Sequence, residues 1–400
     1  MKYCLIGKKL GHSYSKVIHE LQGLDYSLVE VDENQLGDFV KSEFDGFNVT
    51  IPYKKDIIPL LDEVEESARQ IGAVNTVLVK NGKRYGYNTD VFGMEFALNR
   101  ANIDLKGKRI MILGTGGTSL TATAVCKRSG AKEVVYVSRS GEVNYQNCYE
   151  QQVDVIINTT PVGMYPNSHD KPIDLSRFSG LEGVFDCIYN PLRTNLILEA
   201  QRLGIKCSGG LPMLIAQGLK AEEIWLEKPI DKGRYEEVLN IIEKKKRNIV
   251  LIGMPSCGKT TIAKRLSEMT GKEVVDTDEL ILKMQGKRPS EIIEELGEKH
   301  FRDCETVAVK EASKNTGVII ATGGGAILRK ENVDVLKQNG ELIYLERSVE
   351  KLIDDDRPLS KNGAISRLFE IRKPIYEGVC DKKVSNDGEI EKTVREILSL

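Results

Sequence analysis

The chain has 400 residues, 40% of them hydrophobic and 29% charged, and its formal net charge is −2. This length predicts about two or three domains with ordinary hydrophobic cores, and the balanced charge gives no reason to expect a nucleic-acid or membrane partner. The eight cysteines include no C-x-x-C pair, and there is neither a secretion signal nor an apolar run of about 20 residues. We therefore expect a reduced, cytoplasmic protein.

The first hundred residues alternate short apolar runs with polar helical stretches. They predict strands at 3–6, 26–31 and 46–50, then a hairpin about Asn81-Gly82 with strands at 76–79 and 84–87. The alternation then becomes more regular, with strands expected at 109–113, 133–138, 153–157, 183–187 and 205–207. A parallel sheet with crossover helices is typical of this pattern.

An apolar-periodic helix is predicted at 214–228, and the charged, weakly patterned residues 229–247 after it contain the domain boundary. A second unit of strand, glycine loop and helix starts at 248. Further strands are expected at 273–275, 317–321 and 341–345, with a last helix at 389–399. The whole chain is predicted to be of the α/β class.

A glycine-rich turn, Gly114-Thr115-Gly116-Gly117, comes directly after an apolar strand and opens a helix. Backbone N–H groups and the helix dipole there attract an anion, and the lack of a lysine suits a dinucleotide held by its pyrophosphate. Since Ser119 replaces the third glycine of the dinucleotide fingerprint, the turn alone could be a simple strand–helix connection. The next strand ends in Ser138-Arg139-Ser140 without an acid, and an arginine fork suits the 2′-phosphate of NADP.

A second glycine loop, Gly253 to Thr260, has the spacing G-x-x-x-x-G-K-T between a strand and a helix. This pattern predicts a triphosphate site in which Lys259 reaches the β- and γ-phosphates and Thr260 binds magnesium. Asp276 and Asp278 follow the next strand. Because alternate strand residues share a face, we expect both carboxylates to point the same way, one to magnesium and one to the acceptor hydroxyl.

Polar side chains also follow two strands of the first hundred residues. Lys54 comes after one, and Asn88-Thr89-Asp90 after another. A lone lysine or aspartate is usually solvated, but several polar clusters at strand ends indicate a ligand site.

Seven motifs over residues 1–230 occur in family order, and this part of the chain resembles shikimate dehydrogenase. The motifs are Gly11–Ser15, Gly46–Lys54, Ile71–Thr76, Gly86–Asp90, Asn158–Met164, Asp186–Pro191 and Gly210–Leu214 with Gln217. The resemblance implies a substrate-binding domain over 1–98 plus 214–230 and a Rossmann-like NADP domain over 99–213. Leu120, Ser138 and Ser140 depart from residues usual in the family.

The same resemblance implies residue roles. Lys54 and Asp90 would form the catalytic pair, in which the lysine protonates the alkoxide produced by hydride addition. The carboxylate of the substrate would contact Ser13 and Ser15. The other groups of the substrate would contact Thr50, Asn75, Asp90, Tyr189 and Gln217. NADP would contact Gly114, Gly116, Gly117, Ser138, Arg139, Thr159, Gly163, Met164 and Gly210.

Residues 247–400 resemble shikimate kinase through the P-loop, the Asp276-Thr277-Asp278 motif and Gly297–Glu305, Gly323–Gly325, Arg357–Leu359 and Arg372–Tyr376. This implies a P-loop domain like that of the nucleoside monophosphate kinases over 248–400, after a linker at 231–247. Asp276 would support magnesium with Thr260, and Asp278 would bind the acceptor hydroxyl and take its proton. The shikimate-binding set would be Asp278, Arg302, Gly323, Gly324, Gly325 and Arg372.

The ATP-binding set implied by this resemblance is Gly253, Ser256, Cys257, Gly258, Lys259, Thr260, Thr261 and Arg357. Arg357 is the lid arginine, which would stabilise charge on the transferring phosphoryl group. Where the family often has a second lid arginine, this chain has Glu350.

Together the resemblances predict a bifunctional enzyme of the shikimate pathway that uses NADP(H), ATP and Mg²⁺. One half would reduce 3-dehydroshikimate to shikimate, and the other would phosphorylate the shikimate 3-hydroxyl. Two alternatives stay open: a quinate/shikimate dehydrogenase fused to the kinase, and a C-terminal half that only senses nucleotide.

Overall fold

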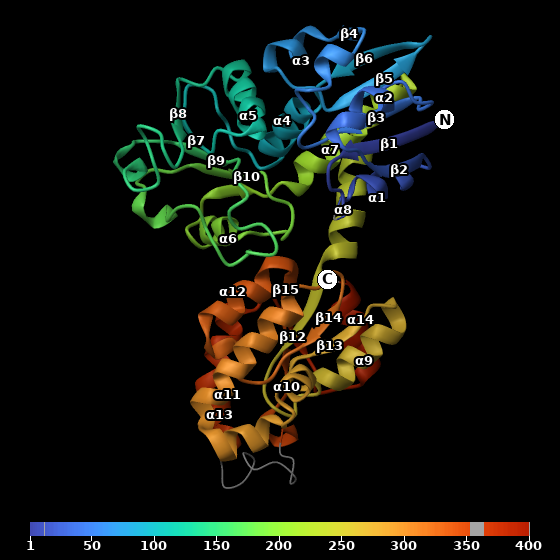
Figure 1. The fold of residues 1–400 in the computed structure, drawn as a ribbon. Helices are drawn as coiled ribbons and strands as arrows, with labels where there is room; N and C mark the ends of the chain where they lie inside the picture. Colours follow the sequence, from blue (N-terminus) through green and yellow to red (C-terminus); the bar gives the residue numbers. More distant parts are fainter. Residues whose placement is uncertain (12, 353–363, 400) are drawn as a thin grey trace. The chain divides into compact units, whose positions relative to one another are not determined.

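The computed structural model describes residues 1–11, 13–352 and 364–399. They form two compact units, Met1–Ile242 and Glu243–Leu400 (Figure 1). Two sheets lie in the first unit and one in the second. The predicted α/β class is confirmed. Within the described ranges, no helix is long and apolar enough to cross a membrane.

The first sheet has the strand order β2-β1-β3-β5-β6-β4. Its strands are β1 (Lys2–Gly7), β2 (Asp25–Glu30), β3 (Gly46–Val49), β4 (Glu63–Val64), β5 (Thr76–Lys80) and β6 (Lys83–Tyr87), accompanied by helices α1 (Ser15–Glu20), α2 (Leu36–Phe39) and α3 (Glu66–Ile71). β1 is parallel to β2 and β3, whereas β5 is antiparallel to β3 and β6. Asn81 and Gly82 have φ angles of 53° and 73°. A two-residue hairpin turn requires such angles, so the predicted hairpin is confirmed.

The second sheet is entirely parallel, with the order β11-β10-β9-β7-β8. Its strands are β7 (Arg109–Leu113), β8 (Glu133–Val137), β9 (Val155–Asn158), β10 (Gly183–Asp186) and β11 (Lys206–Ser208). Helices α4 (Asp90–Arg100), α5 (Gly117–Arg128) and α6 (Asn195–Arg202) accompany them, and α7 (Leu211–Leu226) packs against α4, α1 and β5. The chain leaves β7 for β8 on one side and returns to β9 on the other. Ligands bind at such a switch point, outside the carboxyl ends of the strands.

The segment predicted as a weakly patterned linker, 231–247, is mostly a helix, α8 (Lys232–Lys246). Tyr235, Val238, Leu239 and Ile242 are buried in one cluster with Ile18 and other residues of the first unit. Their spacing is i, i+3, i+4, i+7, the period of an amphipathic helix. Because lysines and other charged residues surround these four positions, the apolar period was not recognised in the sequence. The division between the two units falls after Ile242.

The sheet of the second unit is also parallel, with the order β13-β14-β12-β15-β16. Its strands are β12 (Asn248–Ile252), β13 (Val274–Asp276), β14 (Ile319–Ala321), β15 (Gly340–Glu346) and β16 (Lys382–Ser385). The helices are α9 (Lys259–Thr270), α10 (Thr277–Gln285), α11 (Pro289–Ser313), α12 (Lys330–Asn339), α13 (Ala364–Val379) and α14 (Ile390–Ser399). β16 was not predicted, because only Val384 of its four residues is buried.

Candidate active sites

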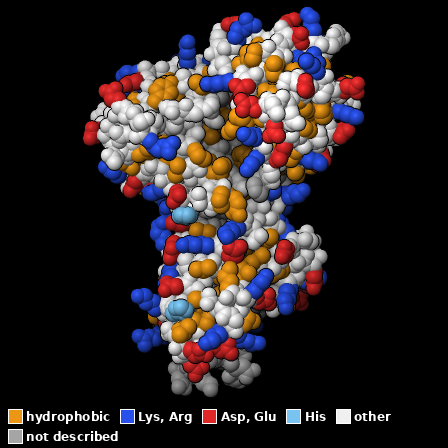
Figure 2. All heavy atoms as spheres, in the orientation of Figure 1, with side chains coloured by type: hydrophobic (Ala, Val, Ile, Leu, Met, Phe, Trp, Pro, Cys, Tyr) orange, Lys and Arg blue, Asp and Glu red, His pale blue; other side chains and the backbone are white. Residues whose placement is uncertain are grey.

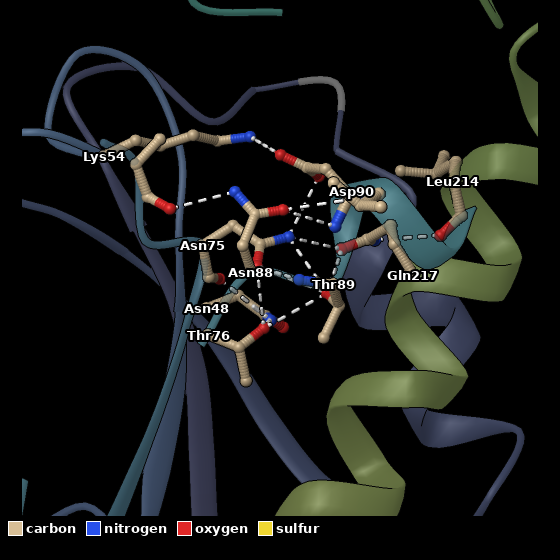
Figure 3. A network of polar contacts seen from close by, with 11 residues as sticks. Asn48, Lys54, Asn75, Thr76, Asn88, Thr89, Asp90, Leu214 and Gln217 are labelled. Carbon is tan, nitrogen blue, oxygen red and sulfur yellow. Dashed lines mark hydrogen bonds and ion pairs between the residues drawn. The ribbon is translucent and has the colours of Figure 1, made fainter. Parts of the chain in front are cut away.

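Lys54 and Asp90 form an ion pair in the first unit, with 2.6 Å between Lys54 Nζ and Asp90 Oδ2 (Figure 3). Lys54 lies in the loop after β3, and its carbonyl accepts a hydrogen bond from the Val74 N–H. Asp90 is the first residue of α4. Their side chains are 27% and 13% exposed. The pair is therefore shielded from bulk water but still open to a ligand.

Asn75 organises the groups around this pair. Its Nδ2 lies 2.9 Å from Asp90 Oδ1, 3.0 Å from Thr89 Oγ1 and 3.3 Å from Gln217 Oε1. Its Oδ1 accepts a hydrogen bond from the Thr89 N–H. Figure 3 shows Gln217 reaching the network from α7 and Asp90 from the start of α4. The predicted residues Lys54, Asn75, Asp90 and Gln217 are thus brought together by separate elements.

The sequence indicated no role for Asn48, although it lies within the Gly46–Lys54 motif. It is buried in β3 and donates to the Asn75 carbonyl at 3.2 Å and to Thr76 Oγ1 at 3.1 Å. The Tyr26 hydroxyl donates to its Oδ1 at 2.7 Å. An amide side chain inside an otherwise apolar strand is the signal that could have revealed this role.

The remaining predicted substrate residues lie elsewhere in the same unit. Ser15 begins α1 and is buried, and its N–H donates to Ser13 Oγ at 3.2 Å. The Tyr189 ring packs 5.3 Å from that of Tyr14. In the described ranges, Ser13, Ser15, Thr50 and Tyr189 make no hydrogen bond to the ion pair, so their substrate contacts stay predictions.

The first glycine turn sits at the switch point of the second sheet. Gly114 has a φ of 97°, and a Cβ there would lie 2.9 Å from Thr160 Cγ2 and 3.1 Å from Thr159 Oγ1. The Thr159 hydroxyl donates to the Leu113 carbonyl at 2.6 Å, which ties β9 to the turn. A Cβ on Gly116 or Gly117 would meet nothing within 4 Å, and no side chain caps α5. The open front and uncapped N–H groups fit a pyrophosphate.

Other predicted NADP residues surround the carboxyl ends of this sheet. Arg139 is exposed after β8 and makes no ion pair within the described residues, so its guanidinium is available to a 2′-phosphate. Met164 is also exposed, and Gly163 has a φ of 95°. Gly210 is required by packing, because a Cβ would lie 2.1 Å from the Cys187 carbonyl oxygen. Contacts of these residues and of Ser138 with NADP stay predictions.

Asp186, at the end of β10, is a buried carboxyl group to which sequence reasoning gave no role. Burial raises its pKa to about 6, although Thr194 Oγ1, the Ile188 N–H and Asn158 Nδ2 all donate to it. The network joins β9, β10 and the start of α6. It supports the carboxyl ends of β9 and β10, beside the first glycine turn.

The backbone of the second glycine loop surrounds the side chain of Lys259. Gly253, Ser256 and Gly258 have φ angles of 150°, 62° and 93°. Lys259 Nζ donates to the carbonyls of Gly253 at 2.9 Å and Met254 at 2.8 Å. The loop thus holds an ammonium group at its centre, as a triphosphate site requires. Cys257 is fully buried, whereas Thr260 and Thr261 are exposed in the first turn of α9.

Thr260 and Asp276 meet beside this loop, with 3.0 Å between Thr260 Oγ1 and Asp276 Oδ2. Asp276 ends β13, and its Oδ1 caps α10 by accepting the Asp278 N–H at 2.9 Å. Among the described residues there is no cluster of three or more His, Cys, Asp or Glu side chains that could hold a metal. One carboxylate and one hydroxyl fit Mg²⁺, which takes most of its other ligands from phosphates and water.

The expectation that Asp276 and Asp278 share a face of one strand is wrong. β13 ends at Asp276, and Asp278 lies in the first turn of α10. Helical geometry therefore turns the two carboxylates to different neighbours. Asp276 Oδ2 accepts a hydrogen bond from Thr260, whereas Asp278 Oδ1 lies beside Gly323, 2.9 Å from the position that a Cβ would take on that glycine.

The predicted acceptor residues gather around the glycine trio. A Cβ on Gly325 would lie 2.0 Å from Arg302 Nη1, so no side chain fits there. The Gly324 carbonyl accepts hydrogen bonds from the Tyr376 hydroxyl at 2.5 Å and from Arg372 Nη1 at 3.3 Å. The structure thus brings together Asp278, Arg302, Gly323, Gly324, Gly325 and Arg372. Arg357 lies outside the described residues.

Glu305 ends the Gly297–Glu305 motif, but the sequence indicated no role for it. It is 1% exposed, and its Oε2 accepts a 2.8 Å hydrogen bond from Arg302 Nη1. Burial raises its pKa, and the charge of Asp278 contributes. This buried acid orients Arg302 toward the glycine trio.

Comparison with known proteins follows the same division of the chain. A curated shikimate dehydrogenase (NADP(+)) of Clostridium beijerinckii is 36% identical over 263 residues, which cover 60% of this chain and 97% of that protein. The chain belongs to the shikimate dehydrogenase family. The family model described as the shikimate dehydrogenase substrate binding domain matches residues 5–77, and the shikimate kinase model matches residues 255–400.

Solved structures of shikimate dehydrogenases have the same fold as the first part of the chain. A chorismate mutase/shikimate 5-dehydrogenase fusion protein from Clostridium acetobutylicum is 36% identical, with a TM-score of 0.59 over 61% of this chain and 97% of its own. A quinate dehydrogenase from Corynebacterium glutamicum in complex with NAD is 27% identical, with a TM-score of 0.55 over 60% of this chain and 99% of its own.

The predicted fusion is therefore confirmed: the chain joins a shikimate dehydrogenase to a shikimate kinase domain and is a bifunctional enzyme of the shikimate pathway. Shikimate is a substrate of both families. The predicted cofactors, NADP(H), ATP and Mg²⁺, are those of these two families.

Proposed function

We propose that the first unit reduces 3-dehydroshikimate to shikimate with NADPH, and that the second transfers the γ-phosphoryl group of MgATP to the shikimate 3-hydroxyl. The product of the first reaction is then the acceptor in the second. The observation that carries the first reaction is the shielded Lys54–Asp90 pair within a network of amide and hydroxyl groups. The second reaction is supported by Lys259 at the centre of its loop.

Reduction of a ketone needs a proton donor where the alkoxide develops. Among the nine residues labelled in Figure 3, Lys54 is the one cation, and Asp90 holds its ammonium group at 2.6 Å. Asn75 and Gln217 offer amide groups suited to ring hydroxyls, and Ser13, Ser15, Thr50 and Tyr189 complete the proposed substrate site. NADPH supplies the hydride when bound, with its pyrophosphate at Gly114, Gly116 and Gly117 and its 2′-phosphate at Arg139.

Phosphoryl transfer needs charge neutralisation and an oriented hydroxyl. Lys259 would leave the carbonyls of its own loop for the phosphates, while Thr260 and Asp276 hold magnesium. Asp278 would accept the proton of the 3-hydroxyl, and Arg302 and Arg372 would bind the carboxylate of shikimate. Arg357 keeps its proposed lid role.

We assign residues 1–98 plus 214–230 to substrate binding, 99–213 to NADP binding and 248–400 to the kinase. The burial of Tyr235, Val238, Leu239 and Ile242 in the first unit supports grouping α8 with the dehydrogenase. The proposed linker then shortens to the residues between Ile242 and β12.

A coupled assay tests the proposal. Purified full-length protein with 3-dehydroshikimate and NADPH should oxidise NADPH, and added MgATP should then yield ADP and shikimate 3-phosphate. No cofactor oxidation would refute the first reaction. ADP binding without phosphate transfer to added shikimate would favour the nucleotide sensor.

A second candidate for the first unit is quinate oxidation, which the similarity to a quinate dehydrogenase favours. Comparing kcat/KM for quinate and shikimate, each with NAD and NADP, separates the two. The proposal requires shikimate with NADP to be the preferred pair.

A further inference from the structure

Arg347 is a cation beside the loop Gly253–Thr260, and the phosphoryl transfer proposed for this unit does not use it. It directly follows β15, which pairs in parallel with β12, the strand that leads into the loop. Its Nη1 lies 3.7 Å from the position that a Cβ would take on Gly258. Because parallel neighbours end at the same edge of a sheet, β15 places this guanidinium at the loop.

Nothing in the described part of the chain pairs with this side chain. Its Nε is buried without a hydrogen-bond partner, and no described carboxylate lies within ion-pair distance. The nearby Asp387 accepts bonds from the N–H and hydroxyl of Ser348, and its pKa is lowered chiefly by the first of these and only in part by Lys351 and Arg347. A buried donor without a partner is costly, and an anionic ligand would provide one.

The order of the strands indicates which end of the nucleotide comes to Arg347. In the order β13-β14-β12-β15-β16, Asp278 and the glycine trio follow β13 and β14, on one side of the loop. Arg347 and Asn386 follow β15 and β16, on the other side. Since the γ-phosphoryl group must face the acceptor, the remainder of the nucleotide extends toward Arg347.

We propose that Arg347 binds the α-phosphate end of ATP. This inference rests on the proposed ATP-dependent phosphorylation at the same loop. Arg347 would then supply a nucleotide-binding cation in a chain that has Glu350 where related kinases often have a second lid arginine. Because Arg347 would contact the part of the nucleotide that is not transferred, it would hold ATP and ADP alike and leave the chemical step unchanged.

The test uses Arg347→Gln in the full-length protein, with MgADP binding measured by calorimetry and phosphorylation by steady-state kinetics. The Kd for ADP and the KM for ATP should rise about tenfold or more, as loss of a charge-assisted contact predicts. kcat and the KM for shikimate should stay unchanged. The matched control is Arg265→Gln on α9, since Arg265 already pairs with Glu268 and Glu391; it should leave ADP affinity unchanged.

Wild-type ADP affinity in a folded Arg347→Gln protein, checked by circular dichroism, overturns the inference. If that variant does not fold, Arg347→Lys decides: it keeps the charge but loses the guanidinium fork, so ADP binding should still weaken by about threefold or more, and unchanged binding overturns the inference. Failure of the wild-type protein to bind ADP would instead contradict the proposed kinase function.

Discussion

The glycine turn after β7 and the loop after β12 both follow an interior strand of a parallel sheet, but they offer an anion different surroundings. In the first, Gly116 and Gly117 face open space at the start of α5, and no lysine is present. In the second, three residues with positive φ wrap the backbone around Lys259. A pyrophosphate that is only held needs N–H groups and a helix dipole, whereas a phosphoryl group that is transferred needs a charge inside the loop.

Removing the cation of the first site should have the largest effect. Lys54→Ala is expected to lower kcat/KM for 3-dehydroshikimate reduction by ~10²–10⁴, because the proton donor is lost. Shikimate phosphorylation should be unchanged, because Lys54 and the P-loop lie in separate compact units. NADPH oxidation and ADP release, measured on the same preparation, check both expectations.

The reciprocal variant, Lys259→Ala, should lower kcat for phosphorylation by ~10²–10³, since one electrostatic contact to the transferred group is lost. Reduction of 3-dehydroshikimate should be unaffected. The two-site comparison fails if either lysine variant, shown to be folded, loses both activities.

A smaller effect is expected from Arg139→Gln, which removes the exposed arginine after β8. The ratio of kcat/KM with NADPH to that with NADH should fall about tenfold, because a guanidinium contact to the 2′-phosphate disappears. Arg128→Gln, which removes an arginine that already pairs with Glu95, is the control and should keep the ratio. An unchanged ratio in Arg139→Gln would show that NADP selection lies elsewhere.

The smallest effect concerns stability beneath the cofactor turn. Burial raises the pKa of Asp186 to about 6 in the folded state, so the folded protein holds this proton more tightly than the unfolded chain does. The free energy of unfolding that this group contributes is greatest below the unfolded pKa of about 4 and is lost as pH rises through about 6.

Between pH 5 and 7 the free energy of unfolding of the first unit should therefore fall by about 1 kcal/mol more in the wild-type protein than in Asp186→Asn. Urea unfolding followed by tryptophan fluorescence measures this unit alone, because Trp225 is the only tryptophan of the chain. Parallel pH profiles for the two proteins would contradict the raised pKa.

Features encoded in contiguous residues were predictable. The Asn81-Gly82 turn, both glycine-rich turns and most strands of the sheets could be located because local backbone preferences and a period of two act over a few residues. The P-loop signature likewise identified Lys259 and Thr260 without any tertiary information.

Contacts between distant residues could not be predicted in this way. Gln217 meets Asn75 across 142 positions, and Lys54 meets Asp90 across 36. The buried partner of Arg302, the helical position of Asp278 and the apolar stripe of α8 also became evident only after packing. A short motif specifies which chemical groups are available, but the burial of helices against sheets decides which of those groups meet and which lose their water.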